Sequence, residues 1–266
     1  MNYPLLFACL AIIGYFGNTA MIAYDIIKQK IPRTPLYLAW LGVINHSLYI
    51  GLLCALRSGF HYNFFSTASL IALIVTLLLL LAALKQPIEK LGIGLFPISA
   101  VMLLLDLFYG NNTLQPQPSH SWAMSIHILS SMIAFSLLNI AALQAILLTI
   151  QNQQLKSHPP KRFIQSLPAL QTMESLLFEM IATGVIFLSM ALMSGFIFIE
   201  NLFAQHLVHK TVLSIIAWLL FVALLIGRYR YGWRGKRAMK WTLAGFSLLL
   251  LAYFGSKFVL ELILHR

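Results

Sequence analysis

Charged residues are scarce in this chain, which has 266 residues but only 18 Lys or Arg and 7 Asp or Glu. Together they make up 9% of the sequence, whereas hydrophobic residues make up 60%. A soluble globular protein of this composition would expose more apolar surface than such proteins tolerate in water. The shortage of charge therefore excludes the soluble classes and predicts an integral membrane protein.

Cysteines and the motifs of soluble enzymes are also scarce. The two cysteines, Cys9 and Cys54, lie within apolar runs, and no CxxC or CxxCH spacing occurs. The sequence therefore supports neither dithiol redox chemistry nor covalent haem attachment. No GxSxG, P-loop, GxGxxG or HExxH motif is present. We therefore expect no catalytic turnover and do not expect the protein to be an enzyme.

Long apolar segments are what the sequence has in abundance. About 20 residues cross a bilayer core of roughly 30 Å as a helix. Eight stretches are long enough: residues 4–24, 35–56, 64–84, 91–109, 122–150, 176–200, 208–227 and 241–264. No cations precede the first stretch, which predicts an uncleaved span rather than a signal peptide. We expect an all-α polytopic membrane protein, a single membrane domain over residues 1–266 with four spans in 1–119 and the others in 120–266.

The cations are confined to alternate connections between these segments. Most of them follow the first, third, fifth or seventh segment; the exceptions are Arg57, Lys210, Lys257 and Arg266. Such clusters stay on the cytoplasmic side of a bacterial inner membrane. We therefore expect a multi-pass inner membrane protein with both termini in the periplasm. Because no single basic domain exists, the net charge of +11 does not indicate a nucleic-acid partner.

The densest group of cations lies directly before the last apolar segment. It consists of Arg228, Arg230, Arg234, Lys236, Arg237 and Lys240. A basic cluster that leads into a long apolar helix has one stable placement, with the cations among cytoplasmic headgroups and the helix across the bilayer. This stretch therefore sets the expected orientation of the chain.

Residues 162–180, RFIQSLPALQTMESLLFEM, mix apolar and polar side chains at helical spacing. The first part fits a helix that lies along the cytoplasmic interface. An ordinary linker that is broken at Pro168 fits the same residues, and the sequence does not separate the two interpretations.

Histidines carry the most chemical information. His46, His127 and His209 lie within or at the mouth of an apolar segment, all at the depth of the outer leaflet for a rise of about 1.5 Å per residue. Ionisable residues inside a membrane often mark a site, and a neutral imidazole is a good axial ligand of haem iron. Interfacial or helix-packing histidines are the alternative. His206 and His209 share a helix face, which gives a weaker signal for a metal site.

Four stretches in the second half of the chain carry a family resemblance. They are HILSSMIAFSLLNIAALQAILLTIQ (127–151), LPALQTMESLLF (167–178), HKTVLSIIAWLLF (209–221) and GRYRYGWRGKRAMKWTLAGFSLLLLAYFGSKFVLELIL (227–264). These stretches resemble the cytochrome c assembly membrane proteins, the CcsA/CcmC/HemX group, and are closest to its short YpjD-like branch. The resemblance implies a role in cytochrome c biogenesis, since larger members bind haem b and pass it to apocytochrome c outside the membrane.

The resemblance also implies ligands. His127 falls where the family has its first outer haem-ligating histidine, and His265 lies about one residue from the second. His209 stands where the tryptophan-rich segment of the family ends, although residues 200–210 contain no tryptophan. We predict that His127 and His209 hold haem b near the periplasmic face, with His46 and His265 as alternative ligands. The other expected partners are the lipid bilayer and other cytochrome assembly or membrane proteins. A haem-free membrane scaffold or transporter-accessory protein is the alternative function.

Overall fold

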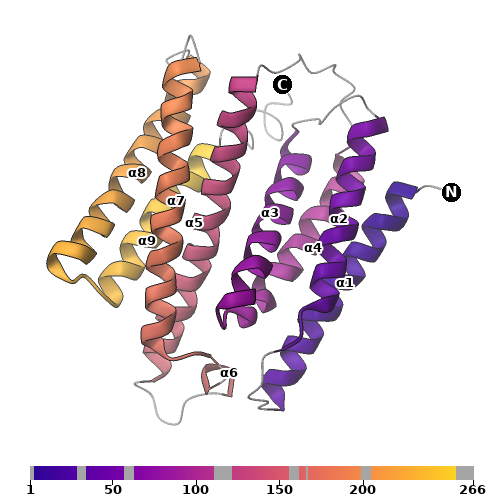
Figure 1. Ribbon diagram of the computed structural model, residues 1–266, viewed down its shortest axis with the longest axis horizontal. Helices are drawn as coiled ribbons and strands as arrows, with labels where there is room; N and C mark the ends of the chain where they lie inside the picture. Colours follow the sequence, from indigo (N-terminus) through magenta and orange to yellow (C-terminus); the bar gives the residue numbers. More distant parts are fainter. Residues whose placement is uncertain are drawn as a thin grey trace. The chain divides into compact units, whose positions relative to one another are not determined.

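The computed structural model describes residues 3–28, 34–56, 63–110, 122–155, 162–165, 167–198 and 205–255. Within these ranges it contains helices and no strands (Figure 1). Eight of the helical segments described are long and apolar enough to cross a membrane. The prediction of an all-α polytopic membrane protein with about eight spans is therefore confirmed. The side of the membrane on which the termini lie stays a prediction.

The helices group into two compact units. Unit 1 comprises residues 1–118 and 160–168, and unit 2 comprises residues 119–159 and 169–266. Whether residues 1–266 act as a single membrane domain stays a prediction.

Unit 1 is built on four long helices. Its elements are α1 (Tyr3–Ile27), α2 (Tyr37–Leu56), α3 (Phe64–Lys85), the 3-10 helix η1 (Glu89–Leu91), α4 (Gly92–Tyr109) and the one-turn α6 (Arg162–Gln165). Helix α1 packs against α2 and α4, and α3 packs against the same two helices, so the four long helices form a closed ring. The short α6 lies against α1.

Unit 2 repeats this arrangement, with three helices longer than any in unit 1 and a shorter fourth. Its elements are α5 (Trp122–Gln154), α7 (Leu170–Phe198), α8 (Gln205–Tyr231), α9 (Lys236–Leu250) and the π-helical turn η2 (Leu251–Gly255). Helix α7 packs against α5 and α8, and α9 packs against the same two helices. Helices α5 and α8 therefore occupy opposite corners of a four-helix ring.

Large apolar side chains cover the outside of both units. Ile13 on α1 is 67% exposed, and Ile197 on α7 is 68% exposed. Exposure of this surface to water would cost free energy in proportion to its area. Contact of the same surface with lipid acyl chains carries no such cost. The exposed apolar side chains therefore fit helices that face lipid.

Glycine lets α1 and α2 cross closely. A Cβ atom on Gly14 would lie 2.7 Å from the carbonyl oxygen of Leu38, and one on Gly42 would lie 2.9 Å from the Tyr15 ring. Close approach of this kind is a main source of helix association in membranes. The contact is reinforced by Asn18, whose side-chain oxygen accepts the backbone N–H of Ala39 at 3.1 Å. That N–H belongs to the first turn of α2 and has no partner within its own helix.

Polar side chains also join α3 to α4. Asn63 caps α3 by accepting the Ser66 N–H at 2.7 Å, and its amide donates to the Gly110 carbonyl oxygen at 2.8 Å. The Ser66 hydroxyl donates to the buried Asp106 carboxylate at 2.6 Å. The aspartate within the apolar fourth span thus has a structural partner.

Two helix starts lie five or more residues before the sequence-based boundaries. Helix α7 begins at Leu170 rather than at residue 176, because the mixed polar and apolar segment after Pro168 continues the helix. Before Pro168, the described residues form the single helical turn α6. Whether this turn lies along the cytoplasmic interface stays a prediction. Helix α9 begins at Lys236 rather than at residue 241, which places the last basic residues on the helix itself. Residues 256–264 of the last predicted span lie outside the described residues.

The glycine crossing gives a first prediction. Gly14→Ala places a methyl group against the Leu38 carbonyl, so we expect it to destabilise the protein by about 1–3 kcal/mol, as overpacking does. The measurement is the thermal unfolding midpoint in mild detergent. Gly51→Ala is the control, because a Cβ atom there meets nothing within 4 Å. Equal midpoints for the two variants would contradict the close crossing.

Candidate functional site

His127 lies in the second turn of α5 and faces α7. Its Nδ1 atom is 2.9 Å from the carbonyl oxygen of Ala191 and 3.3 Å from the hydroxyl oxygen of Ser194. The Ser194 hydroxyl itself donates to the Ala191 carbonyl at 3.0 Å. Because a carbonyl oxygen only accepts hydrogen bonds, Nδ1 of His127 must carry the proton.

This hydrogen bond decides what the rest of the imidazole can do. With the proton on Nδ1, the Nε2 atom of neutral His127 keeps a lone pair that can bind a metal. No hydrogen-bond partner of Nε2 is found within the described ranges. The imidazole is half-buried and held from one side, as are histidines that bind metals.

Small residues on α7 make room for the His127 ring. Ala191, Ser194 and Gly195 are spaced to lie on one face of the helix. A Cβ atom on Gly195 would lie 3.2 Å from Cε1 of His127, so any larger residue would press on the imidazole.

His209 lies near the start of α8, at the same end of unit 2, because α7 ends and α8 begins there (Figure 1). Its side chain is exposed. Helix α8 is tied to α7 by Trp218, whose indole N–H donates to the Ser189 hydroxyl at 2.8 Å. Since α5 and α8 are opposite corners of the ring, the two imidazoles share one end of the unit without a described contact between them.

His46 belongs to unit 1 and is completely buried on α2. Its Nδ1 atom lies 3.1 Å from the Tyr15 hydroxyl of α1, and its Nε2 atom lies 3.0 Å from the Ser69 hydroxyl of α3. Both ring nitrogens are thus engaged, and His46 joins three helices. It would have to give up one of these bonds to coordinate iron.

The remaining candidates fall outside what the structure describes. His265 and the side chain of His206 lie there, so the fourth predicted ligand and the His206 and His209 metal site stay predictions. Among the described residues, no group of three or more His, Cys, Asp or Glu could hold a metal ion. A site built by several such side chains is therefore not found in these ranges, whereas haem iron needs only one or two axial histidines.

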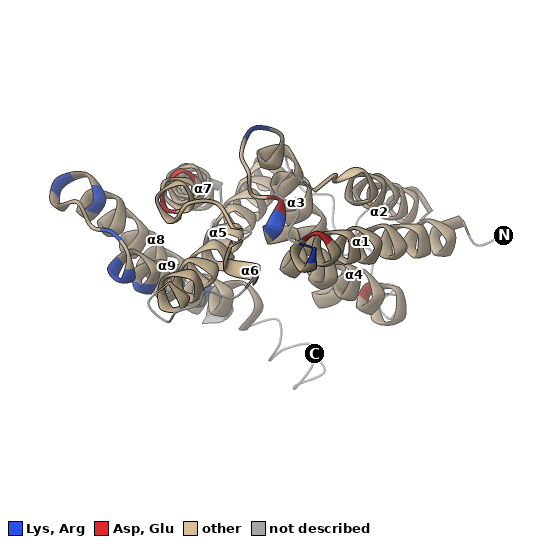
Figure 2. Ribbon diagram, turned by 90° about the horizontal axis from the view of Figure 1, so that it is seen from below, with Lys and Arg blue, Asp and Glu red and all other residues tan. Residues whose placement is uncertain are grey.

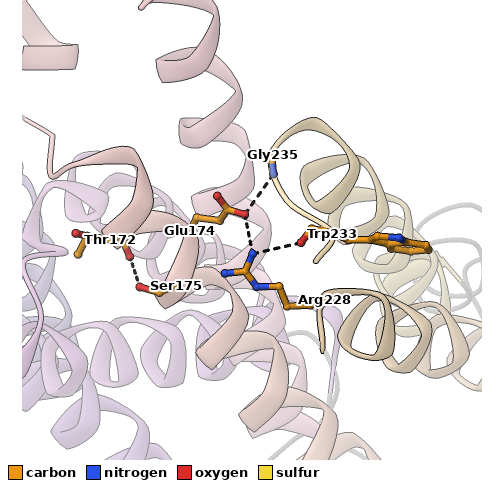
Figure 3. Close-up of polar contacts among 6 residues, drawn as sticks. All are labelled: Thr172, Glu174, Ser175, Arg228, Trp233 and Gly235. Atoms are coloured by element: carbon orange, nitrogen blue, oxygen red, sulfur yellow. Dashed lines mark hydrogen bonds and ion pairs between the residues drawn. The ribbon is translucent and has the colours of Figure 1, made fainter. Parts of the chain in front are cut away.

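A second polar cluster lies at the other end of unit 2, where α7 begins (Figure 3). The buried Glu174 carboxylate lies 3.5 Å from the Arg228 guanidinium and accepts the Gly235 backbone N–H at 3.3 Å. Arg228 also donates to the Trp233 carbonyl oxygen at 3.4 Å, and its guanidinium lies 4.7 Å from the centre of the Phe178 ring. Glu174 therefore holds the α8–α9 loop against α7.

Sequence reasoning missed the residues that position these groups. The small residues within ALMSG, residues 191–195, were the available signal for a close contact of α7. For Glu174, the signal was a carboxylate in the first two turns of an apolar helix, where the helix dipole favours a negative charge. Nothing in the sequence names Arg228 as its partner among the six neighbouring cations.

The chain matches the model of the Cytochrome C assembly protein family over residues 33–264, and it belongs to that family. Family membership supports a role of the cytochrome c biogenesis type. Across 97% of its length the chain is 31% identical to Inner membrane protein YpjD of Escherichia coli (strain K12), of which it covers 98%. Together with the eight apolar helices, this relative identifies a multi-pass inner membrane protein.

The resemblance predicted from four stretches is thus confirmed. A more distant relative is Cytochrome c biogenesis protein CcsA of Prochlorococcus marinus (strain NATL1A), 27% identical over 40% of this chain and 33% of that protein. No solved structure matches the chain.

The Glu174 cluster gives a second prediction. Glu174→Gln removes the charge that holds Arg228 and weakens the bond to Gly235, at a cost of about 1–3 kcal/mol. We expect faster hydrogen–deuterium exchange in residues 232–236, measured by mass spectrometry. Glu179→Gln is the matched control, because Glu179 lies on the same helix with an exposed side chain. Unchanged exchange in the Glu174 variant would show that the carboxylate does not hold the loop.

Proposed function

We propose that the protein binds haem b at the end of unit 2 where α5 begins, with Nε2 of His127 as an axial ligand of the iron. The observation that carries this proposal is the hydrogen bond from Nδ1 of His127 to the Ala191 carbonyl oxygen. It fixes the tautomer and the ring orientation, and it raises the basicity of the nitrogen left for the iron. Haem would be the cargo that the protein holds for cytochrome assembly. His127 would hold it through its iron.

The surroundings of His127 favour a large apolar ligand. Trp122, Ile126 and Leu129 on α5 are 72%, 44% and 58% exposed, and Phe196 on the facing end of α7 is 53% exposed. A porphyrin buries its flat apolar faces against side chains of this kind. These residues would therefore pack against the macrocycle while His127 binds its centre.

The second axial position has two candidates. His209 lies at the same end of the unit with an exposed imidazole, and His265 lies beyond the described residues. His46 is a poorer candidate, because both of its nitrogens already bond neighbouring helices. Binding near the periplasmic face would follow if the basic α8–α9 loop is cytoplasmic, because the His127 end of unit 2 lies opposite that loop (Figure 1).

The test is a haem titration of the purified protein in mild detergent, followed by absorption spectroscopy of the reduced form. We expect saturable binding with a haem Soret band. His127→Ala should abolish the spectrum of histidine-ligated haem. His209→Ala should change the coordination state and leave binding in place. Ser175→Ala, an exposed serine at the other end of α7, is the control. Absence of saturable binding by the intact protein would contradict the proposal and favour the haem-free scaffold.

The α7 contact gives a further prediction that leaves the ligand in place. Gly195→Val presses a side chain against the His127 ring, and we expect about tenfold weaker haem binding, in the range seen when outer contacts of a ligating histidine are lost. Haem affinity measured by the same titration checks this expectation. Gly51→Val is the control, since a Cβ atom at Gly51 meets nothing. Unchanged affinity for Gly195→Val would argue against His127 as the ligand.

A further inference from the structure

The end of unit 2 opposite His127 presents a dense group of cations. Figure 2 shows basic segments at the end of α8 and the start of α9. We call the exposed cations there the basic loop surface: Arg230, Arg234, Lys236, Arg237 and Lys240. Arg228 is not included, because its guanidinium turns toward Glu174.

The charge of the basic loop surface is not neutralised by the described residues of unit 2. Only two carboxylates, Glu174 and Glu179, occur among the described residues of unit 2. Glu174 is occupied by Arg228 and by the Gly235 N–H. Neither carboxylate forms an ion pair with any of the five cations in the described part of the chain. The five positive charges are therefore available to an external anion.

Several contacts within the loop that carries these cations stabilise its conformation. Gly232 and Gly235 have φ angles of 62° and 57°, which favour glycine, and they turn the chain between α8 and α9. The Trp233 N–H donates to the Gly227 carbonyl at 3.1 Å, and its indole lies 5.2 Å from that of Trp241. Arg237 lies over the Trp233 ring at 5.0 Å. An anion would meet a preorganised surface, which lowers the entropic cost of binding.

Apolar surface runs directly from these cations along α8. Leu219 and Ile226 are each 52% exposed, and Ile226 lies one turn before Arg230 on the same helix face. Tyr229 and Tyr231 are 90% and 76% exposed, and tyrosine side chains concentrate at the level of lipid headgroups. A ligand that suits this surface combines an anionic group with a long apolar chain.

We propose that the basic loop surface binds the phosphate headgroup of an anionic phospholipid, whose acyl chain lies along the Leu219 and Ile226 face of α8. Guanidinium groups bind phosphate oxygens through paired N–H donors, and lysines add point charges. Clusters of four to eight cations beside a membrane helix are typical of binding sites for anionic lipids. The lipid would fix this end of unit 2 in the headgroup layer, independently of any haem at the other end.

The test compares lipids in an uncharged detergent, with the thermal unfolding midpoint of the full-length protein as readout. We expect phosphatidylglycerol to raise the midpoint in a saturable way and phosphatidylcholine to have little effect. Arg237→Gln combined with Lys240→Gln should weaken the apparent affinity for phosphatidylglycerol by about fivefold per cation, hence roughly 25-fold. The control is Lys28→Gln combined with Lys85→Gln, which removes two exposed cations from unit 1 and should keep the wild-type affinity.

Three results would overturn the proposal. They are equal effects of the two lipids, an equal loss of affinity in the control variant, and a full midpoint shift produced by soluble glycerol phosphate, which would indicate a site for free anions. If the double variant does not fold, Lys240→Gln alone serves, because Lys240 is exposed and should still lower the affinity about fivefold. Native mass spectrometry of the lipid-bound protein gives an independent readout.

Discussion

Polar groups between membrane helices have no water to bond to, and this constraint organises both units. In unit 1, His46 satisfies its two nitrogens with a tyrosine from α1 and a serine from α3, so one buried side chain fixes three helices. In unit 2, the buried Gln144 of α5 donates to the Met173 carbonyl of α7 at 3.0 Å. Each of these hydrogen bonds specifies which helices pack together. Contacts between apolar side chains do not do so by themselves, because those side chains pack equally well against lipid.

The same constraint separates the two ends of unit 2. At one end, the α7 backbone holds one nitrogen of His127 and leaves the other available, so the polar group is only half satisfied by the protein. At the other end, Glu174 binds Arg228 and Gly235 together and completes a structural contact. Helix α7 takes part in both contacts, so it connects the candidate ligand site to the loop for which we propose lipid binding.

The sequence was sufficient to predict the membrane-spanning helices, but it was insufficient to predict which side chains contact one another. Apolar segments about 20 residues long predicted all eight spans, because length and hydropathy alone decide whether a helix can cross a bilayer. Boundaries failed where polar residues extend a helix beyond its apolar part, as at Leu170 and Lys236. Histidine depth grouped His46 with His127, yet depth does not show which nitrogens are already bonded. That information lies in contacts between distant residues, such as His127 with Ala191.

The most direct test of whether His127 binds haem iron is an experimental structure of the haem-loaded protein, determined with a bound antibody fragment to add mass. It should show the porphyrin beside the start of α5, with Nε2 of His127 bonded to the iron and Nδ1 still donating to the Ala191 carbonyl. Haem bound elsewhere in the protein, or His127 turned so that Nδ1 faces the iron, would contradict the central claim.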